Sequence, residues 1–199
     1  MIPGIVLAAG KSSRMGRTKA LLSIGEGETF LSRVVRTLTD GGVEEIVVVV
    51  GADADAIRAS ADRYAMPVRV VDNPDYEQGQ LSSLVKGLHA VDRPALTAAL
   101  VTLIDVPLVA PETVRTLLQE YTAGSALIVR PASRGRHGHP VIFDRALFDE
   151  LRQANPKEGA KEVVRAYSAE VMNVEMTDEG AFTDIDTPED YARYITGSR

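Results

Sequence analysis

Short apolar runs that alternate with helical patterns constrain the fold of this chain most strongly. The run Ile46–Val50 is continuous and β-branched, which is typical of a strand buried on both faces of a sheet. Similar runs at 5–7, 68–71 and 98–104 are separated by segments with apolar residues at helical spacing, such as 31–38. A repeated strand–helix order predicts a three-layer α/β sandwich with a mostly parallel, Rossmann-like sheet and helices on both of its faces.

The remaining elements are predicted from caps, breakers and spacing. In the first half we expect further helices after a cap at Asp53, with Ile57, Ala61 and Tyr64 facing inward, and at 80–90 and 111–121. The second half is less regular and is predicted to contain strands at 126–129, 141–143 and 171–174, a loop at 130–140, helices at 145–153 and 161–167, and a last helix capped by Thr187. No linker-like segment or internal repeat is present, so we expect residues 1–199 to form a single domain.

The composition excludes several classes of function. The net charge is −6, and ten aromatic residues without Trp argue against a nucleic-acid partner. No apolar stretch approaches the ~20 residues of a membrane span, and no signal-peptide pattern opens the chain. The absence of Cys excludes disulfides and thiolate metal sites and fits a reducing compartment. We therefore expect a cytoplasmic protein with no membrane partner.

The loop after the first apolar run concentrates positive charge. Small residues at 8–10 let backbone approach a ligand, and four cations follow with no carboxylate before Ser23, namely Lys11, Arg14, Arg17 and Lys19. The rest of the chain carries −10, so this loop is a local trap for an anion such as a polyphosphate. A dinucleotide fingerprint would need glycine at Ala8 and Ser13, and a P-loop would need it at Ile5. A solvated basic loop is the alternative reading.

Two later loops are predicted to face this one, because ligands of open α/β sheets bind beyond the carboxyl ends of the strands. Asp105 ends an apolar strand and is a candidate Mg²⁺ ligand, although it could also cap the following turn. The loop at 72–83 offers small and amide side chains that could cradle a base and ribose, namely Asn73, Gly79, Ser82 and Ser83. An Asn-Pro pair also occurs in plain turns.

The segment 130–140 leaves more than one reading open. His137 and His139 could be metal ligands or an acid–base pair, and they could equally be anion contacts or turn residues. Arg130, Arg134 and Arg136 could bind an acceptor's phosphate or form a solvated basic loop.

These residues resemble a known family. The pattern Leu7-Ala-Ala-Gly-x-Ser-x-Arg-Met-Gly-x-x-Lys19 is similar to the opening motif of MobA-like nucleotidyltransferases. Its Ala8-Ala9-Gly10 form resembles the molybdenum cofactor cytidylyltransferase branch, whose guanylyl relatives read Ala-Gly-Gly. The resemblance continues in order through Asn73, Gly79, Ser82-Ser83, Gly87, Asp105-x-Pro107, Gly138-His139-Pro140-Val141 and Asp184–Asp190.

The resemblance implies a fold of the nucleotide-diphospho-sugar transferase type and a complete activity. The enzyme would move CMP, or another NMP, from a nucleoside triphosphate to a phosphorylated small molecule and release pyrophosphate. CTP and molybdopterin are the leading donor and acceptor, and a molybdoenzyme could receive the product. Mg²⁺ would be the cofactor, with Mn²⁺ as a substitute.

The resemblance also implies roles for particular residues. Arg14 and Lys19 would hold the triphosphate, Asp105 would bind the metal, and Asp186 would lie near the acceptor phosphate or the same metal. The nucleotide-binding set would further comprise Leu7, Ala8, Ala9, Gly10, Met15, Gly16, Asn73, Gly79, Ser82 and Ser83. The acceptor side would comprise Gly138, His139 and Pro140.

The sequence departs from the cytidylyltransferase pattern at two places. Ile104 and Val106 flank Asp105 where that branch usually has Gly or Cys and Gln or Met. Pro156–Lys161 replaces a Gly-Asp-x-Gly-Ala-Arg motif, so Lys157 reverses a charge on the expected acceptor side. Alternative functions are therefore transfer to a sugar phosphate or another phosphorylated metabolite, or a non-catalytic nucleotide-binding protein of molybdoenzyme maturation.

Overall fold

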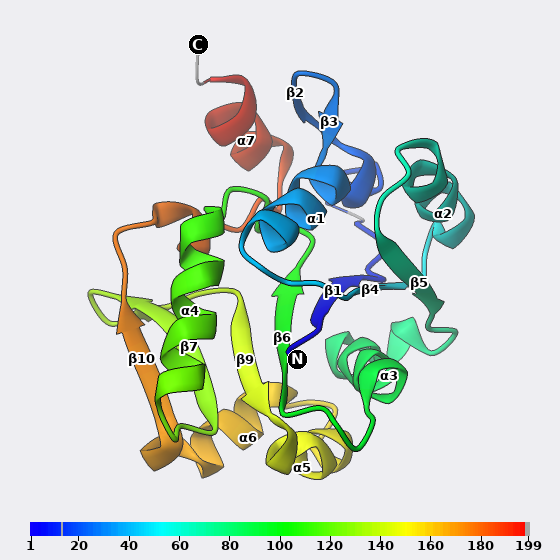
Figure 1. Cartoon of the computed structure of the whole chain (residues 1–199). Coiled ribbons are helices and arrows are strands. Elements are labelled where there is room, and N and C mark those ends of the chain that lie inside the picture. The colour runs from blue at the N-terminus through cyan, green and yellow to red at the C-terminus, as the bar shows by residue number, and fades with distance from the viewer. Residues whose placement is uncertain (13, 198–199) are drawn as a thin grey trace.

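A computed structural model describes residues 1–12 and 14–197, so Ser13 of the cation-rich loop lies outside the described residues. The central sheet is built from strands β1 (Gly4–Ala8), β4 (Ile46–Val50), β5 (Val68–Asp72), β6 (Ala98–Leu103), β7 (Ile128–Ser133), β8 (Arg136–His137), β9 (Val141–Asp144) and β10 (Val171–Glu175). Its order in the described chain is β10-β7-β9-β6-β1-β4-β5, and β8 pairs with β7 (Figure 1). A separate hairpin joins β2 (Ser23–Gly25) to β3 (Glu28–Thr29).

The sheet is mostly parallel, as the alternation of apolar runs predicts. Strand β1 pairs in parallel with both β4 and β6, and β4 pairs in parallel with β5. Strand β9 runs the other way, antiparallel to β6 on one side and to β7 on the other. The carboxyl ends of β1 and β6 therefore lie side by side, which brings the loops after Ala8 and Leu103 together.

Helices cover both faces of this sheet (Figure 1). They are α1 (Phe30–Asp40), α2 (Ala54–Arg63), α3 (Gln80–Val91), α4 (Pro111–Ala123), α5 (Phe148–Gln153), α6 (Ala160–Ala166) and α7 (Pro188–Tyr191). Alternate residues of β1 point to opposite faces: Val6 packs with the apolar stripe of α1, while Ile5 and Leu7 pack with α3. Both faces of the sheet are buried, and the three-layer expectation is confirmed.

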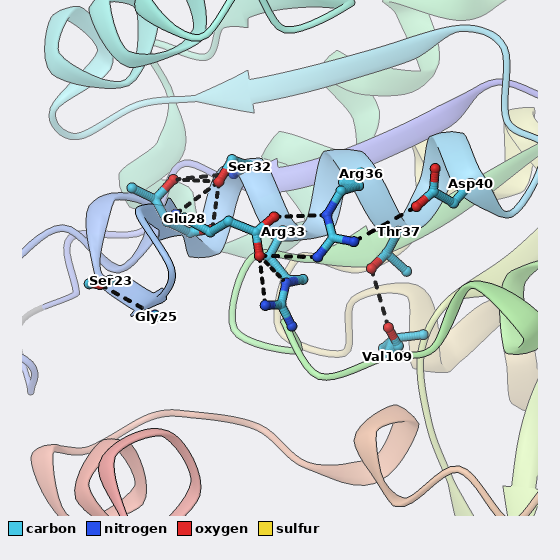
Figure 2. Close-up of polar contacts among 10 residues, drawn as sticks. Ser23, Gly25, Glu28, Ser32, Arg33, Arg36, Thr37, Asp40 and Val109 are labelled. Atoms are coloured by element: carbon cyan, nitrogen blue, oxygen red, sulfur yellow. Dashed lines mark hydrogen bonds and ion pairs between the residues drawn. The ribbon is translucent and has the colours of Figure 1, made fainter. Parts of the chain in front are cut away.

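Polar contacts fix α1 beside the loop that follows β6 (Figure 2). The side chains of Thr29 and Ser32 form a capping box at the start of α1. Thr37 is buried, and its hydroxyl donates to the carbonyl of Val109 at 3.3 Å. Nearby, Glu28 accepts from Arg33 and Arg36, the latter at 2.8 Å. The Thr37 hydrogen bond ties α1 to the 104–110 loop.

Several local predictions are corrected. The expected loop at 130–140 contains the end of β7 and all of β8, and the preceding strand starts at Ile128 rather than at 126. Arg130 makes the strand look interrupted, but its guanidinium is half-buried and donates to Asn173 of β10 at 2.8 Å. Tyr64, expected to face inward, follows the end of α2 and is 49% exposed.

Of the two predicted helix caps, the one at Thr187 is confirmed and the one at Asp53 is wrong. Asp53 precedes α2 as expected, but it adopts a left-handed conformation with φ 56°, and its carboxylate accepts from the Thr18 hydroxyl instead of capping the helix. Thr187 and Pro188 begin α7 as predicted, with a reciprocal cap between Thr187 and Asp190. Among the described helices, none combines the length and apolar character that a bilayer crossing requires.

Candidate functional site

A pocket of about 310 Å³ lies at the carboxyl ends of β1 and β6. Three predicted loops meet there, together with a segment near the C-terminus, as the rule for open α/β sheets anticipates. Its lining consists of Leu7, Ala8, Ala9, Gly10, Ser12, Arg14, Thr18, Lys19, Ala20, Tyr76, Gly79, Gln80, Ser83, Leu103, Ile104, Asp105 and Asp186.

Two hydrogen bonds to Ser12 shape the cation-rich loop that follows β1. The carbonyl of Ser12 accepts from the Met15 N–H at 2.9 Å, and the Ser12 hydroxyl accepts from the Lys19 N–H at 3.1 Å. Ser12 and Gly16 both have positive φ, which lets the chain reverse within a few residues. Small residues at 8–10 leave the pocket floor to backbone groups, and Lys19 is carried to its edge by a short 3₁₀ turn, Lys19–Leu21.

Two cations and two carboxylates form one cluster inside the pocket. Lys19 Nζ lies 3.1 Å from Asp105 Oδ2 and also contacts Asp186 Oδ1, while an Arg14 guanidinium nitrogen lies 3.1 Å from Asp186 Oδ2. The Lys19 side chain is only 10% exposed, whereas that of Arg14 is 68% exposed. The hydrogen bond from Lys19 and the charges of Lys19 and Arg14 hold the pKa of Asp186 below its usual value, against the opposing effect of burial.

The carboxylates of the pocket include an oxygen that could still bind a cation. Asp105 Oδ1 is buried and has no hydrogen-bond partner among the described residues, which is a costly state for a charged oxygen. Burial and the neighbouring charges of Asp105 and Asp186 raise the pKa of Asp184, against the opposing charge of Lys19. Oxygen ligands of this kind suit Mg²⁺ or Mn²⁺. In the described chain no three or more His, Cys, Asp or Glu side chains gather as a metal site, so such an ion would need phosphate and water oxygens as further ligands.

The second predicted loop contributes Gly79 and Ser83 to the pocket, while Asn73 and Ser82 support them from behind. The buried Asn73 side chain donates to Ser82 Oγ at 2.9 Å and to Ser83 Oγ at 3.0 Å, and it accepts from the Asp75 N–H. Ser83 is itself buried yet lines the pocket, and the hydrogen bond from Asn73 fixes the position of its side chain. Met15 and Gly16 of the first loop likewise lie outside the lining.

Sequence reasoning missed several lining residues, among them Tyr76 and Gln80. The Tyr76 ring packs directly on Gly51, where a Cβ would come within 2.5 Å of it, and Lys11 Nζ lies 5.9 Å from the ring centroid. Lys11 also pairs with Glu77 at 2.5 Å, which links the first loop to the second across the pocket. No periodicity marks a loop tyrosine, and Gln80 carries only the signal of a helix start.

The expected acceptor residues lie beside the pocket and not in its lining. Burial lowers the pKa of His139, opposed by the charge of Asp105 and a backbone hydrogen bond to Val101, and His139 Nδ1 has no partner among the described residues. Gly138 and Pro140 are both buried, and Gly138 lies directly against Ala181 and Phe182 of the same chain. The other histidine of this region, His137, is exposed on β8.

The arginines at 130, 134 and 136 and the 156–161 segment, which departs from the cytidylyltransferase motif, lie outside the pocket lining. Arg136 pairs with Glu179 at 2.8 Å and lies over the Phe182 ring, so this cation is already engaged. Pro156 lines a separate groove beside α3, and Lys157 is exposed in the turn that follows it.

Comparisons with known proteins agree with this geometry. Residues 4–171 match the MobA-like NTP transferase domain. The chain is 31% identical to the nicotine blue oxidoreductase of Paenarthrobacter nicotinovorans, over 98% of this chain and 96% of that protein. It is 28% identical to the molybdenum cofactor cytidylyltransferase of Escherichia coli (strain K12), over 94% of this chain and 92% of that protein.

Solved structures share the fold of this chain. Rv0371c from Mycobacterium tuberculosis H37Rv superposes with a TM-score of 0.81 at 29% identity, over 98% of each chain. A structure of Rv0371c in complex with manganese superposes with a TM-score of 0.71 at 27% identity, over 98% of each chain. The family resemblance inferred from the motifs is thus confirmed.

Proposed function

Because the chain belongs to the MobA-like NTP transferase family of nucleotidyltransferases, we propose that it transfers CMP from CTP to a phosphorylated small molecule and releases pyrophosphate. We propose molybdopterin as the acceptor and Mg²⁺ as the cofactor, with Mn²⁺ able to replace it. The Ala8-Ala9-Gly10 form of the first motif supports CTP, and the relative from Escherichia coli supports both substrates by its name.

The observation that carries this proposal is the contact of Lys19 with Asp105 and Asp186. It places a buried cation between two carboxylates on the edge of a pocket whose floor is backbone. Lys19 and Arg14 are positioned to exchange these carboxylates for phosphate oxygens, since charge-assisted contacts to phosphate are strong. Asp105 and Asp186 are then free to hold the divalent ion, and the unpartnered Asp105 Oδ1 supports this exchange.

Nucleotidyl transfer requires positioning and charge neutralisation more than a covalent nucleophile. An oxygen of the acceptor phosphate attacks the α-phosphorus of CTP, and the bond from that phosphorus to the bridging oxygen of the β-phosphate breaks. Lys19 and Arg14 stabilise the negative charge that builds on the departing pyrophosphate. The metal ion, when bound, neutralises phosphate charge further. Ser83, oriented by Asn73, faces the nucleotide from the other side of the pocket.

Transfer to another phosphorylated metabolite is the second candidate. Lys157 reverses the charge of the family's motif, and the relative from Paenarthrobacter nicotinovorans carries a name unconnected with molybdopterin. A non-catalytic maturation protein is less well supported, because Arg14, Lys19, Asp105 and Asp186 all lie together in the pocket.

Pyrophosphate release with CTP, GTP, ATP and UTP, each combined with molybdopterin or with sugar 1-phosphates, tests both candidates. We expect the fastest release from CTP with molybdopterin, dependent on Mg²⁺ or Mn²⁺ and abolished by EDTA. Release with a sugar phosphate alone would replace molybdopterin as acceptor, and faster release from GTP would contradict CTP. A Lys86→Met variant, in an exposed position on α3, serves as the control for variants of Lys19.

A further inference from the structure

The place of Asp186 depends on a connection that contains little regular structure. Between the end of β10 at Glu175 and the start of α7 at Pro188, the chain makes one short 3₁₀ turn, Glu179–Phe182. A carboxylate at the end of such a connection needs contacts from outside it to stay opposite Lys19. The described residues supply these contacts at the two ends and in the middle.

At one end, the carboxylate of Asp178 collects three donors. Asp178 Oδ2 accepts from the Ala110 N–H at 2.9 Å and from the Thr113 hydroxyl at 2.6 Å, while Oδ1 accepts from the Gly180 N–H at 3.0 Å. Ala110 is the residue that precedes α4, and its methyl group cannot cap the helix. Asp178 therefore caps α4 from a distant part of the chain, where the helix dipole also favours a negative charge.

In the middle, backbone lies directly on backbone. A Cβ added at Gly180 would come within 2.0 Å of the Leu108 carbonyl oxygen, and one at Gly138 within 2.1 Å of the Ala181 carbonyl oxygen. The Ala181 carbonyl also accepts from the His139 N–H at 2.9 Å. These approaches hold the connection against both Leu108 and the 138–139 segment.

At the other end, the Ile185 N–H donates to the carbonyl of Asp105 at 2.8 Å, and Ile185 is fully buried. The next residue is Asp186. The two carboxylates that contact Lys19 are thus held in register by a backbone bond between their own segments, and Asp178 anchors the same two segments at their far end.

We propose that Asp178 is a positioning residue for the reaction: by joining the start of α4 to the connection before α7, it holds Asp186 at the distance from Asp105 and Lys19 that a divalent ion requires. This inference rests on the proposed function and adds to it a residue outside the pocket. Residues that orient metal-binding groups without touching the ion typically change metal affinity or activity by about 10–100-fold when they are removed.

The test measures Mn²⁺ affinity in the presence of CTP, beside the melting temperature. Binding to the protein is taken as the loss of the free-ion electron paramagnetic resonance signal beyond the loss that the same CTP concentration causes without protein. We expect Asp178→Asn to weaken Mn²⁺ affinity by about 10-fold and to raise the KM for the metal in parallel. Thr113→Val, which removes one donor, should act in the same direction to a smaller extent, and Thr113→Ser should restore the wild-type affinity. This pair keeps the test decisive if Asp178→Asn folds poorly.

Asp92→Asn is the matched control, because it removes ion pairs with Arg145 and Arg152, which belong neither to the connection before α7 nor to the 104–110 loop. It should lower the melting temperature and leave the Mn²⁺ affinity unchanged. If Asp178→Asn and Thr113→Val behave as this control does, the inference is wrong. If the wild-type protein binds Mn²⁺ with CTP but releases no pyrophosphate with any acceptor, the proposed reaction fails while the metal affinities still decide the role of Asp178. A wild-type protein that binds no Mn²⁺ overturns both.

Discussion

Lys19 Nζ lies 3.1 Å from Asp105 Oδ2, although the two residues are 86 positions apart in the chain. The same ammonium group donates to Asp186, which is 167 positions away. One buried cation therefore joins three segments that the sheet brings to the same edge. The cations of the pocket are paired with carboxylates, so an incoming phosphate group must exchange with these carboxylates.

Removing the Lys19 ammonium group should damage both catalysis and the charge balance. We expect Lys19→Met to lower kcat/KM for pyrophosphate release by about 10²–10³-fold, as for the loss of one preorganised contact to developing charge. The variant leaves Asp105 and Asp186 without their shared cation, so Mg²⁺ should raise its melting temperature more than that of the wild type. Lys86→Met should behave as the wild type in both assays, and equal rates for the two variants would refute the role of Lys19.

Asp105 should matter for the metal more than for the nucleotide. In Asp105→Asn we expect Mg²⁺-dependent turnover to be lost, because the buried carboxylate oxygen without a partner is replaced by a neutral amide. CTP affinity without metal should stay within a few-fold of the wild type, as measured by isothermal titration calorimetry. Asp55→Asn on α2 is the control. Undiminished turnover in Asp105→Asn would remove this residue from metal binding.

Asp186 should compete with anions when no metal is present. Its carboxylate contacts Lys19 and Arg14, so Asp186→Asn frees Arg14 and leaves Lys19 paired with Asp105 alone. We expect inorganic pyrophosphate, in EDTA, to bind this variant up to about fivefold more tightly, which corresponds to an ion pair of about 1 kcal/mol. Turnover with Mg²⁺ should fall at the same time. Glu189→Gln, an exposed change on α7, should alter neither quantity, and weaker pyrophosphate binding by Asp186→Asn would contradict the competition.

The connection before α7 should not tolerate a side chain at its closest approach. Gly180→Ala would place a methyl group within 2.0 Å of the Leu108 carbonyl oxygen, so the backbone must move. We expect a lower melting temperature and at least tenfold slower pyrophosphate release, because the displaced segment carries Asp186. Gly124→Ala, at the end of α4, has its nearest contact at 3.1 Å and should be tolerated far better. Equal rates for both variants would show that the connection is free to adjust.

Asp92 should stabilise the protein in a pH-dependent way. The hydrogen bonds and charges of Arg152 and Arg145 hold its pKa below the ordinary value of 3.8, against the effect of burial. A lowered pKa in the folded state adds stability above the unfolded pKa, and this stability is lost as the pH falls through the folded pKa.

We therefore expect Asp92→Asn to lower the free energy of unfolding by about 1 kcal/mol at pH 7, as measured by urea denaturation. The difference from the wild type should shrink as the pH falls below 3.8. Asp149→Asn removes a much more exposed partner of the same Arg152 and should have a smaller effect. A difference that stays constant down to low pH would exclude the ion pairs as its source.

Much of the first half of the fold could be predicted because β1 and β4 are apolar runs and α1 and α3 have clear apolar stripes. The hairpin of β2 and β3 was not predicted, because its short strands have no apolar run. The direction of β9 could not be predicted, because Val141–Asp144 has the same alternation in either orientation and only its pairing with β6 decides. The end of β7 was hidden by Arg130, whose guanidinium donates a hydrogen bond to Asn173 of β10, 43 positions away.

In the candidate site, too, some residues could be identified from the sequence and others could not. Lys19 and Asp105 could be singled out from their own surroundings, as a cation in a small-residue loop and a carboxylate at the end of an apolar strand. Asp186 was reached only through the family resemblance, because nothing local distinguishes it from Asp184 or Asp190. Tyr76 joins the pocket because Gly51 leaves room for its ring, a relation between two loops that neither sequence segment contains.

The distances along the sequence between Lys19 and its two carboxylate partners also set the order in which the site is synthesised. At about 5–20 residues per second, a ribosome adds Asp105 about 4–17 s after Lys19, and Asp186 about 8–33 s after it. The cations of the first loop thus emerge before their partners: Glu77 becomes available to Lys11 first, and Lys19 gains Asp105 when β6 joins β1. Asp186, the partner of both Lys19 and Arg14, is made last. Completion of the pocket is a late event of synthesis, although the loop that defines it is among the first parts of the chain to be made.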